Sequence, residues 1–347
     1  MIVEQPKLQA DIRTLLERIG YPDSPYLAEV LTLVASPQEL HWLTLLPATA
    51  DELATRAGLA SDEARNVLQD LYVRGLVLAG EPPANDADAG PVYDTPRTSG
   101  TFVDLLLFDQ RYRRLGSHFY DLFSQFYNLE EVYMERSPER LPMRVVPVEE
   151  RIGDTRAVLP YERVTAILAG ARRIAVEHCP CRQRERKCDN PTEVCLSFDT
   201  LADYSIGRGI GREITLAEAQ ALLADCEQRG LVHQVDNTDR PTVLCNCCSC
   251  CCAFLVAINR YGLQNVVATS RYRAKIEQDT CIACGTCQER CPFGAIAHTD
   301  NSGYVVTATQ CFGCGLCAST CPAKAITLEL VASEDHIPHH NPTILQV

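Results

Sequence analysis

The spacing of apolar residues predicts a helix, a turn, a second helix and a strand between residues 51 and 80. Gly58 suits the turn, and Ser61 is expected to cap the second helix, whose apolar residues recur at steps of three and four. Gly75 stands at the end of that helix and precedes a short Leu-Val-Leu strand. A loop rich in Pro, Gly and Asp follows at 80–91 and separates this unit from the next segment.

This order of elements resembles a winged helix, and we assign it to a domain at residues 1–100. Such a fold can bind DNA by placing its second helix in the major groove. Charge argues against DNA here, because that helix opens with Asp62 and Glu63, and residues 1–100 carry 7 basic against 15 acidic side chains. We therefore expect a protein-docking or dimerising adaptor that does not bind DNA specifically.

An apolar and aromatic segment follows at 102–133, where Leu, Phe and Tyr recur at three- and four-residue steps. This pattern predicts one or two amphipathic helices. Pro138 and Pro142 end the pattern, so we place a helical connector at 101–145. Core packing is the expected role of its apolar face, and a docking surface for a partner is the alternative.

The region at 146–270 mixes helical and strand patterns, and we expect it to form an α+β domain. A helix is predicted at 161–173, directly before a strand. Thr215 and Glu218 form a capping-box pattern at the start of another helix, and a further strand is expected at 231–235. The whole chain is therefore predicted to be a multidomain α+β protein.

Composition narrows the class of protein. The 347 residues are 46% apolar and 22% charged, which is typical of a globular chain with two or three domains. The longest apolar run, Cys251–Ile258, is far shorter than the roughly 18 residues that a membrane helix requires. The N-terminus lacks the charged-then-apolar order of a secretory signal. We expect a cytoplasmic protein without membrane insertion, and the net charge of −13 argues against coating nucleic acid or anionic lipid.

Nineteen cysteines, all between Cys179 and Cys321, dominate the second half of the chain. Thiols stay reduced in the cytoplasm, and an odd number cannot pair completely in disulfides. The spacing of these cysteines instead indicates metal ligation. Cys226, inside a predicted helix, is expected to be a core thiol and is set apart from the others.

Two copies of the pattern C-x2-C-x2-C-x3-C-P stand 30 residues apart, beginning at Cys281 and at Cys311. An Ala-Ile dipeptide follows each copy at the same distance, so the segment is an internal duplication. The pattern resembles the bacterial dicluster ferredoxins. We assign residues 271–330 to a 2[4Fe–4S] ferredoxin domain and 331–347 to a C-terminal tail.

This resemblance implies which cysteines hold each cluster, because in that family the fourth cysteine of each run binds the other cluster. One [4Fe–4S] cluster would be bound by Cys281, Cys284, Cys287 and Cys321. The second would be bound by Cys311, Cys314, Cys317 and Cys291. Glycines beside these ligands would let backbone N–H groups approach the sulfides, namely Gly285, Gly313 and Gly315.

Ten further thiols in the middle region are candidate ligands for one or two more iron–sulfur clusters: Cys179, Cys181, Cys188, Cys195, Cys245, Cys247, Cys248, Cys250, Cys251 and Cys252. Four plus four of them would ligate two cubanes and leave two over. Pro180 indicates a turn that could aim the sulfurs on either side of it at one site. Zinc is the main competitor for these thiols.

The order of motifs along the chain resembles a wider family of iron–sulfur proteins from anaerobes, the 4Fe–4S dicluster proteins with a CNCC motif. The shared elements are LPYERV, HCPCR, CDNPTEVCL, GREIT, GLVH and CNCCSCCC, followed by the dicluster segment. The winged-helix-like start also belongs to that pattern. The resemblance implies cytoplasmic electron transfer and brings no substrate with it.

Three functions follow from these patterns. The leading one is an electron-transfer protein that relays single electrons between a ferredoxin-like donor and a partner redox enzyme, as a homo-oligomer or as a subunit of a larger complex. The second is a reductase with a catalytic, atypical cluster in the middle region. The third is a redox-sensing regulator that binds DNA, against which the acidic second helix weighs.

Overall fold

The computed structural model describes residues 4–82, 84, 89–128, 141–152, 157–300 and 303–339. Contacts divide the chain into two compact units. The first contains the described residues up to 128 together with Arg208–Ile210, and the second contains the remaining described residues from 141 onward. Parts of the predicted connector and of the predicted C-terminal tail lie outside the described residues.

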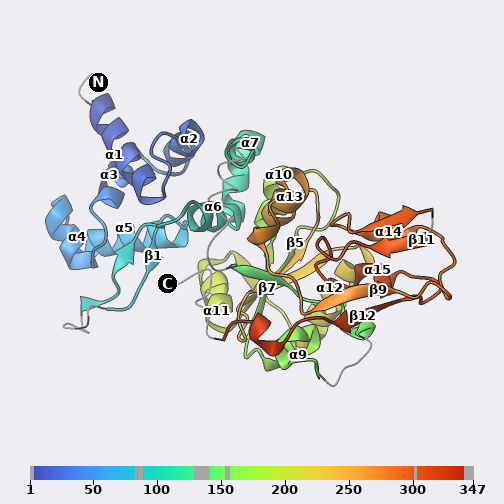
Figure 1. The fold of residues 1–347 in the computed structure, drawn as a ribbon. Coiled ribbons are helices and arrows are strands. Elements are labelled where there is room, and N and C mark those ends of the chain that lie inside the picture. The colour runs from blue at the N-terminus through green and yellow to red at the C-terminus, as the bar shows by residue number, and fades with distance from the viewer. Residues whose placement is uncertain are drawn as a thin grey trace. The chain divides into compact units, whose positions relative to one another are not determined.

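The first unit begins with five helices and a two-stranded antiparallel sheet (Figure 1). They are α1 (Glu4–Arg18), α2 (Pro25–Val34), α3 (Pro37–Thr44), α4 (Ala50–Ala57), α5 (Ser61–Val73), β1 (Leu78–Ala79) and β2 (Tyr93–Asp94). Ala48, between α3 and α4, forms an additional antiparallel bridge with Tyr93. The order α4, turn, α5 and β1 is the one expected from the sequence for residues 51–80, whereas α1, α2, α3 and β2 were not predicted. The assignment as a winged helix stays a prediction.

Local sequence explains the two central helices of this unit. Thr49 caps α4 through a capping box with Glu52, and Gly58 ends the helix in the left-handed region, where a side chain would be strained. The predicted cap of α5 is wrong by one residue: Ala60 is the N-cap, without a side-chain bond, and Ser61 is the first helical residue.

The aromatic segment forms α6 (Ser99–Leu107), a 3-10 helix η2 (Gln110–Leu115) and α7 (Gly116–Phe126). The aromatic face of α7 is buried, as its spacing predicts, and Phe119 stacks on Tyr112 with ring centroids 5.4 Å apart. Phe126 meets Tyr21 edge-to-face at 4.8 Å. This segment therefore packs into the core of the first unit.

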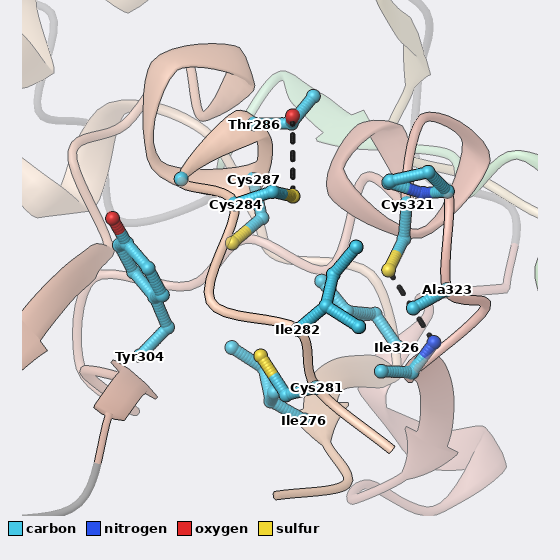
Figure 2. Close-up of a pocket in the computed structure, with 13 residues that line it drawn as sticks. Ile276, Cys281, Ile282, Cys284, Thr286, Cys287, Tyr304, Cys321, Ala323 and Ile326 are labelled. Carbon is cyan, nitrogen blue, oxygen red and sulfur yellow. Dashed lines mark hydrogen bonds between the residues drawn. The ribbon is translucent and has the colours of Figure 1, made fainter.

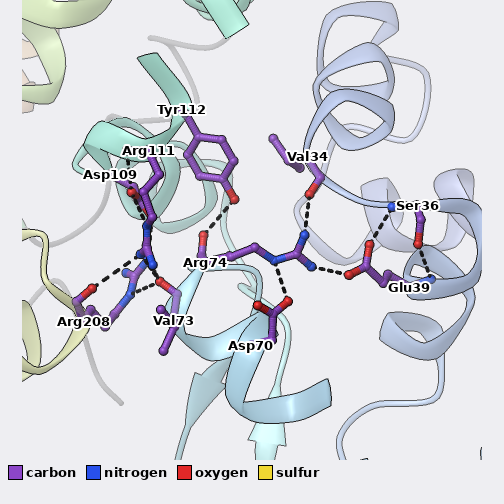
Figure 3. A network of polar contacts seen from close by, with 10 residues as sticks. All are labelled: Val34, Ser36, Glu39, Asp70, Val73, Arg74, Asp109, Arg111, Tyr112 and Arg208. Carbon is purple, nitrogen blue, oxygen red and sulfur yellow. Dashed lines mark hydrogen bonds and ion pairs between the residues drawn. The ribbon is translucent and has the colours of Figure 1, made fainter. Parts of the chain in front are cut away.

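Arginines tie the helices of the first unit together (Figure 3). Arg74, at the end of α5, forms ion pairs with Glu39 at 2.5 Å and with Asp70 at 2.9 Å. Arg111 binds the buried carboxylate of Asp109 and donates to the Val73 carbonyl, which also accepts from Arg208 at 3.3 Å. The bonds from Arg111 and Arg208 satisfy the Val73 carbonyl, in the last turn of α5, which the helix itself leaves without a partner.

The second unit is built on a six-stranded antiparallel sheet with the order β3-β7-β8-β5-β4-β6. The strands are β3 (Met143–Val145), β4 (Ile174–His178), β5 (Glu193–Phe198), β6 (Gly211–Glu213), β7 (Val232–Asp236) and β8 (Val243–Cys247). The helices are α9 (Val164–Gly170), α10 (Pro180–Glu185), α11 (Asp199–Arg208), α12 (Leu216–Gln228) and α13 (Ala253–Tyr261). Short 3-10 turns lie at η3 (Glu149–Arg151), η5 (Pro160–Glu162) and η6 (Gln264–Val266).

The sequence patterns of this unit are largely met. Thr215 and Glu218 form the predicted capping box at the start of α12, and the strand expected at 231–235 is β7. The helix predicted at 161–173 is shorter in the structure, where it is α9 (Val164–Gly170). The backbone becomes extended at Ala171, before β4 begins. Isoleucine, valine and leucine side chains from α9, α12 and the sheet form one core beneath the strands.

The C-terminal part of the second unit consists of two small antiparallel pairs, β9 with β12 and β10 with β11 (Figure 1). Its elements are β9 (Tyr272–Ile276), α14 (Thr286–Arg290), β10 (Ile296–Thr299), β11 (Gly303–Val306), α15 (Leu316–Ser319), β12 (Ile326–Leu330) and η7 (Glu334–His336). A buried ion pair at 2.6 Å, between Arg271 and Glu162, joins this part to the sheet domain. In the described part of the chain, no helix has both the length and the apolar character that crossing a membrane demands.

Candidate functional site

Two cavities lie in the C-terminal part of the second unit, and each is lined by four cysteines. The first cluster cavity is lined by Cys281, Cys284, Cys287 and Cys321. Figure 2 shows these four side chains around one space, with Ile282 and Tyr304 beside them. The second cluster cavity is lined by Cys291, Cys311, Cys314 and Cys317. The fourth cysteine of each run therefore lies with the first three of the other run.

The two repeats also share an unusual backbone. Left-handed φ angles occur at three pairs of positions that are 30 residues apart: Ala283 and Gly313, Gly285 and Gly315, and Gly294 and Lys324. In addition, the backbone N–H groups of Ala295 and Ala325 each donate to the sulfur of a fourth cysteine at 3.3 Å. Such N–H donors favour the thiolate form that a metal ligand requires.

The two cavities differ in their exposure to solvent. Cys284 is exposed in the first cavity, and Ile282 beside it is 64% exposed. In the second cavity Cys314 and Cys317 are buried, whereas Cys291 and Cys311 are partly exposed. Burial raises the pKa of Cys314 to about 12, and it also raises the pKa of Cys317. A cationic iron core would offset that burial penalty, because it favours deprotonated sulfur.

The ten middle thiols are brought together by the sheet. Cys195 lies in β5 and Cys245 in the neighbouring strand β8, where the register pairs Leu196 with Leu244. One further step in that register would set Cys195 opposite Cys245, and the two thiols are neighbours. Cys179 directly follows β4 and is the N-cap of α10, while Cys252 follows β8 after a short turn and is the N-cap of α13. The Pro180 segment thus starts a helix rather than a simple turn.

Six of these thiols neighbour one another in a closed ring, which we call the six-thiol set: Cys179, Cys181, Cys252, Cys247, Cys245 and Cys195 in order around the ring. Hydrogen bonds from Cys179 and Cys252 hold the pKa of Cys181 well below its usual range. Bonds from Cys195 and Cys247 do the same for Cys245. The ring therefore favours two thiolates, each held between two thiols.

The other four, which we call the four-thiol set, form a separate group: Cys188, Cys248, Cys250 and Cys251. Their ligand atoms all lie within 4.8 Å of one another. Cys188 comes from the loop after α10, and the other three come from the turn between β8 and α13. The ten thiols are thus divided six and four, which differs from the predicted four plus four with two left over.

Arg182 of α10 is an almost fully buried cation between the two sets, with 2% of its surface exposed. It lies beside Cys248, with Cys179 and Cys195 as further neighbours. Its guanidinium also donates to the carbonyls of Pro191 and Asn246. Burial acts to lower the pKa of Arg182, but the neighbouring cysteine sulfurs outweigh it and raise that pKa. The pKa of Cys248 is itself lowered, so the buried cation lies beside a sulfur that favours the thiolate form.

Two nearby residues are structural. Cys226 on α12 is fully buried, and its pKa is raised to about 12 by that burial, as suits a core thiol. His233 on β7 is buried and hydrogen-bonds to Asn246 at 2.7 Å and to Glu227 at 3.2 Å. Arg182 was not singled out from the sequence, although its place in the HCPCR motif, directly after two candidate ligands, was a usable signal.

Comparison with known families agrees with the chemistry of the C-terminal part. Residues 274–328 match the family model described as a 4Fe–4S dicluster domain. This range contains all eight cysteines of the two cluster cavities. No curated protein and no solved structure matches the chain. The chain therefore carries an iron–sulfur dicluster domain at its C-terminal side.

Proposed function

We propose that this protein is a multi-cluster electron-transfer protein, which passes single electrons between a soluble redox donor and a partner enzyme. The observation that carries the proposal is the pair of four-cysteine cavities inside a segment that matches the dicluster family. Each four-cysteine cavity would bind one [4Fe–4S] cluster, and the charge of such a cluster changes by one when it gains or loses an electron. The chain's own residues supply the thiolates, the N–H donors and the burial that tunes each potential.

The difference in exposure gives the relay a direction. The first cluster cavity opens to solvent at Cys284 and Ile282, so its cluster would meet an external redox partner. None of the four cysteines of the second cavity is fully exposed. Its loop is also bonded to the sheet domain, because the N–H of Val148 donates to the Cys314 carbonyl at 3.0 Å. Its cluster would therefore exchange electrons with the interior of the protein.

A short connection leads from the second cavity to the middle thiols. Asn259 on α13 donates to the Pro292 carbonyl at 2.8 Å, next to the ligand Cys291. Cys252 of the six-thiol set caps the same helix seven residues earlier. Seven residues of helix rise about 10 Å, so the two groups of thiols lie at either end of a short, rigid element.

We further propose that the six-thiol set holds one additional iron–sulfur cluster. Besides its two favoured thiolates, the set receives N–H bonds from Ala253 to Cys181 and from Leu255 to Cys252. Four of the six cysteines are buried, which suits a relay cluster better than one that binds a substrate directly. The six-thiol set has two more thiols than the four that a cubane cluster needs as ligands. Those two sulfurs would remain as hydrogen-bonding neighbours.

Iron and sulfide analysis of anaerobically purified protein tests this proposal. We expect about twelve iron and about twelve sulfide per chain, four of each per cluster. About eight of each would contradict the additional cluster. Reduction of the protein by a reduced ferredoxin, followed by stopped-flow spectroscopy, tests the function itself. Clusters that neither accept nor return electrons on that timescale would contradict the relay.

For the N-terminal part of the chain we propose a protein-docking adaptor rather than a DNA-binding module. Asp62 and Glu63 are exposed at the start of α5. Arg65, one turn further on, is held by Asp62 at 2.9 Å. A helix that presents acidic groups at its first turn repels the phosphates that DNA binding must approach.

A further inference from the structure

We infer that the four-thiol set is a mononuclear metal site, in which one zinc-class ion is bound by Cys188, Cys248, Cys250 and Cys251. The site is distinct from the clusters of the relay and does not depend on the electron-transfer function. The sequence pattern named these four cysteines among ten candidate ligands but did not assign them to a site of their own.

The distances between the sulfurs carry this inference. Cys188 Sγ lies 3.8 Å from Cys248 Sγ and 3.9 Å from Cys251 Sγ, and the sulfurs of Cys250 and Cys251 are 3.7 Å apart. The sulfurs of the remaining three pairs also lie within 4.8 Å of one another. Four sulfurs held tetrahedrally at about 2.3 Å from one ion lie about 3.8 Å apart.

The protein itself provides a comparison with a cluster site. A cubane carries its four thiolates on four different irons, so the sulfurs are held further apart than around one ion. Across the described residues, the four-thiol set is the only group of Cys, His, Asp or Glu whose ligand atoms all lie within 4.8 Å. The cysteines around the two cluster cavities do not approach one another in this way, although they belong to the dicluster domain.

The surroundings of the four sulfurs suit a permanently bound ion. Asn190 Nδ2 donates to Cys188 at 3.5 Å, the backbone N–H of Lys187 donates to Cys251, and Arg182 donates to Cys248. Such donors orient metal-bound sulfur and reduce its negative charge. Four thiolates around a divalent ion carry a net charge of −2, and the buried Arg182 offsets part of it.

Closed four-sulfur coordination leaves no open position on the ion, which is the arrangement of a structural zinc site. A single iron ion can occupy the same tetrahedral site of four sulfurs, so the experiments below also determine which metal is bound. In either case the ion fixes the loop carrying Cys188 to the turn at 248–251. That turn leads directly into Cys252, so the ion would position one ligand of the six-thiol set.

The decisive experiment compares the full-length chain with the double variant Cys188→Ser/Cys250→Ser, both purified anaerobically. We expect the variant to lose one zinc atom, or one iron atom, per chain, without losing sulfide. Cys226→Ala removes a buried thiol outside both sets and should retain every metal atom. Loss of about four iron with four sulfide would overturn the inference, as would no loss of metal.

A spectroscopic measurement on the unmodified protein keeps the inference testable if the double variant does not fold. X-ray absorption at the zinc edge should show four sulfur ligands at about 2.3 Å and no metal neighbour. If the ion is iron, Mössbauer spectra should contain one tetrahedral, sulfide-free iron besides the clusters. Absence of both signals overturns the site while leaving the iron count of the relay unchanged. A functioning site in a chain that transfers no electrons would contradict only the proposed function.

Discussion

A β-carbon placed on Gly313 would lie 2.0 Å from the carbonyl oxygen of Tyr272, a contact that side chains do not make. The loop of the second cluster cavity therefore passes directly against the backbone of β9, and only glycine leaves room for it. Gly294 has a similar left-handed φ of +62°, compared with +68° for Gly313, but nothing lies within 4 Å of its β-carbon position.

These two glycines provide a matched pair of variants. Gly294→Ala should lower the free energy of unfolding by about 1–2 kcal/mol, which is the usual penalty for alanine in a left-handed conformation. Gly313→Ala should cost clearly more and reduce the occupancy of the second cluster, because the loop must also move away from Tyr272. Denaturation curves and iron content check this. Equal behaviour of the two variants would contradict the close approach.

The crossed arrangement of ligands predicts which cluster each fourth cysteine serves. Cys321→Ser should damage the cluster bound by Cys281, Cys284 and Cys287, since its sulfur lines that cavity. Cys291→Ser should instead damage the cluster bound by the second run. Electron paramagnetic resonance of the reduced variants distinguishes the two clusters. The assignment fails if each variant loses the signal of its own run.

We expect Arg182, the buried cation of α10, to be required for metal binding by the middle thiols but not by the dicluster domain. Arg182→Met leaves thiolates beside an apolar side chain, so we expect loss of metal from the middle region with eight iron atoms retained in the dicluster domain. Removing one partner of a buried charge pair typically costs about 3–5 kcal/mol.

Arg144 supplies the control for that variant. It is equally buried, but its guanidinium binds the backbone carbonyls of Asp236, Thr238 and Tyr161. Arg144→Met should destabilise the fold while each folded chain keeps its full metal content. If both variants lose the same metals, Arg182 has no special relation to the thiols.

The exposed edge of the first cluster cavity should control exchange with the external redox partner. Ile282→Asp should slow electron exchange with a reduced ferredoxin, by about tenfold for an interaction free energy of about 1.4 kcal/mol, and leave iron content unchanged. Val331→Asp changes another exposed apolar residue, which does not line the cavity, and should have little effect. Stopped-flow rates measure both, and unchanged kinetics for Ile282→Asp would argue for contact elsewhere.

The acidic start of α5 predicts weak and nonspecific behaviour toward DNA. Titration of the full-length chain with duplex DNA at physiological salt should show no sequence-selective binding at nanomolar concentration. Reversing the charges with Asp62→Lys and Glu63→Lys should increase nonspecific binding, because phosphates could then approach the helix. Tight, selective binding by the unmodified chain would show that the charge argument is wrong.

The sequence predicts the dicluster segment well because its ligands are local. The 30-residue repeat places Cys281 and Cys311 in equivalent loops, and the left-handed positions recur in both, even where Ala283 and Lys324 replace glycine. A family pattern then supplies the crossing of the fourth ligands. The helices at 51–73 and 216–228 could also be predicted from the sequence, since capping residues and apolar spacing act within a few residues.

The sequence could not predict how the ten middle thiols divide into two sets, because their grouping depends on long-range strand register. Cys195 meets Cys245 only because β5 and β8 are neighbours, although fifty residues separate them. The split between Cys251 and Cys252 depends on where β8 ends and α13 begins, and boundaries of this kind are the least predictable feature of a sequence.

The peptide bond between Cys251 and Cys252 joins two different proposed metal sites and therefore constrains how the protein is matured. Neither site can be filled without fixing the backbone that presents the other, so metal delivery to them is expected to be ordered rather than independent. A chain that receives the wrong ion first would hold its neighbouring ligands in a misplaced position. If both proposed sites are filled, maturation of this protein would depend on the single turn at 248–252.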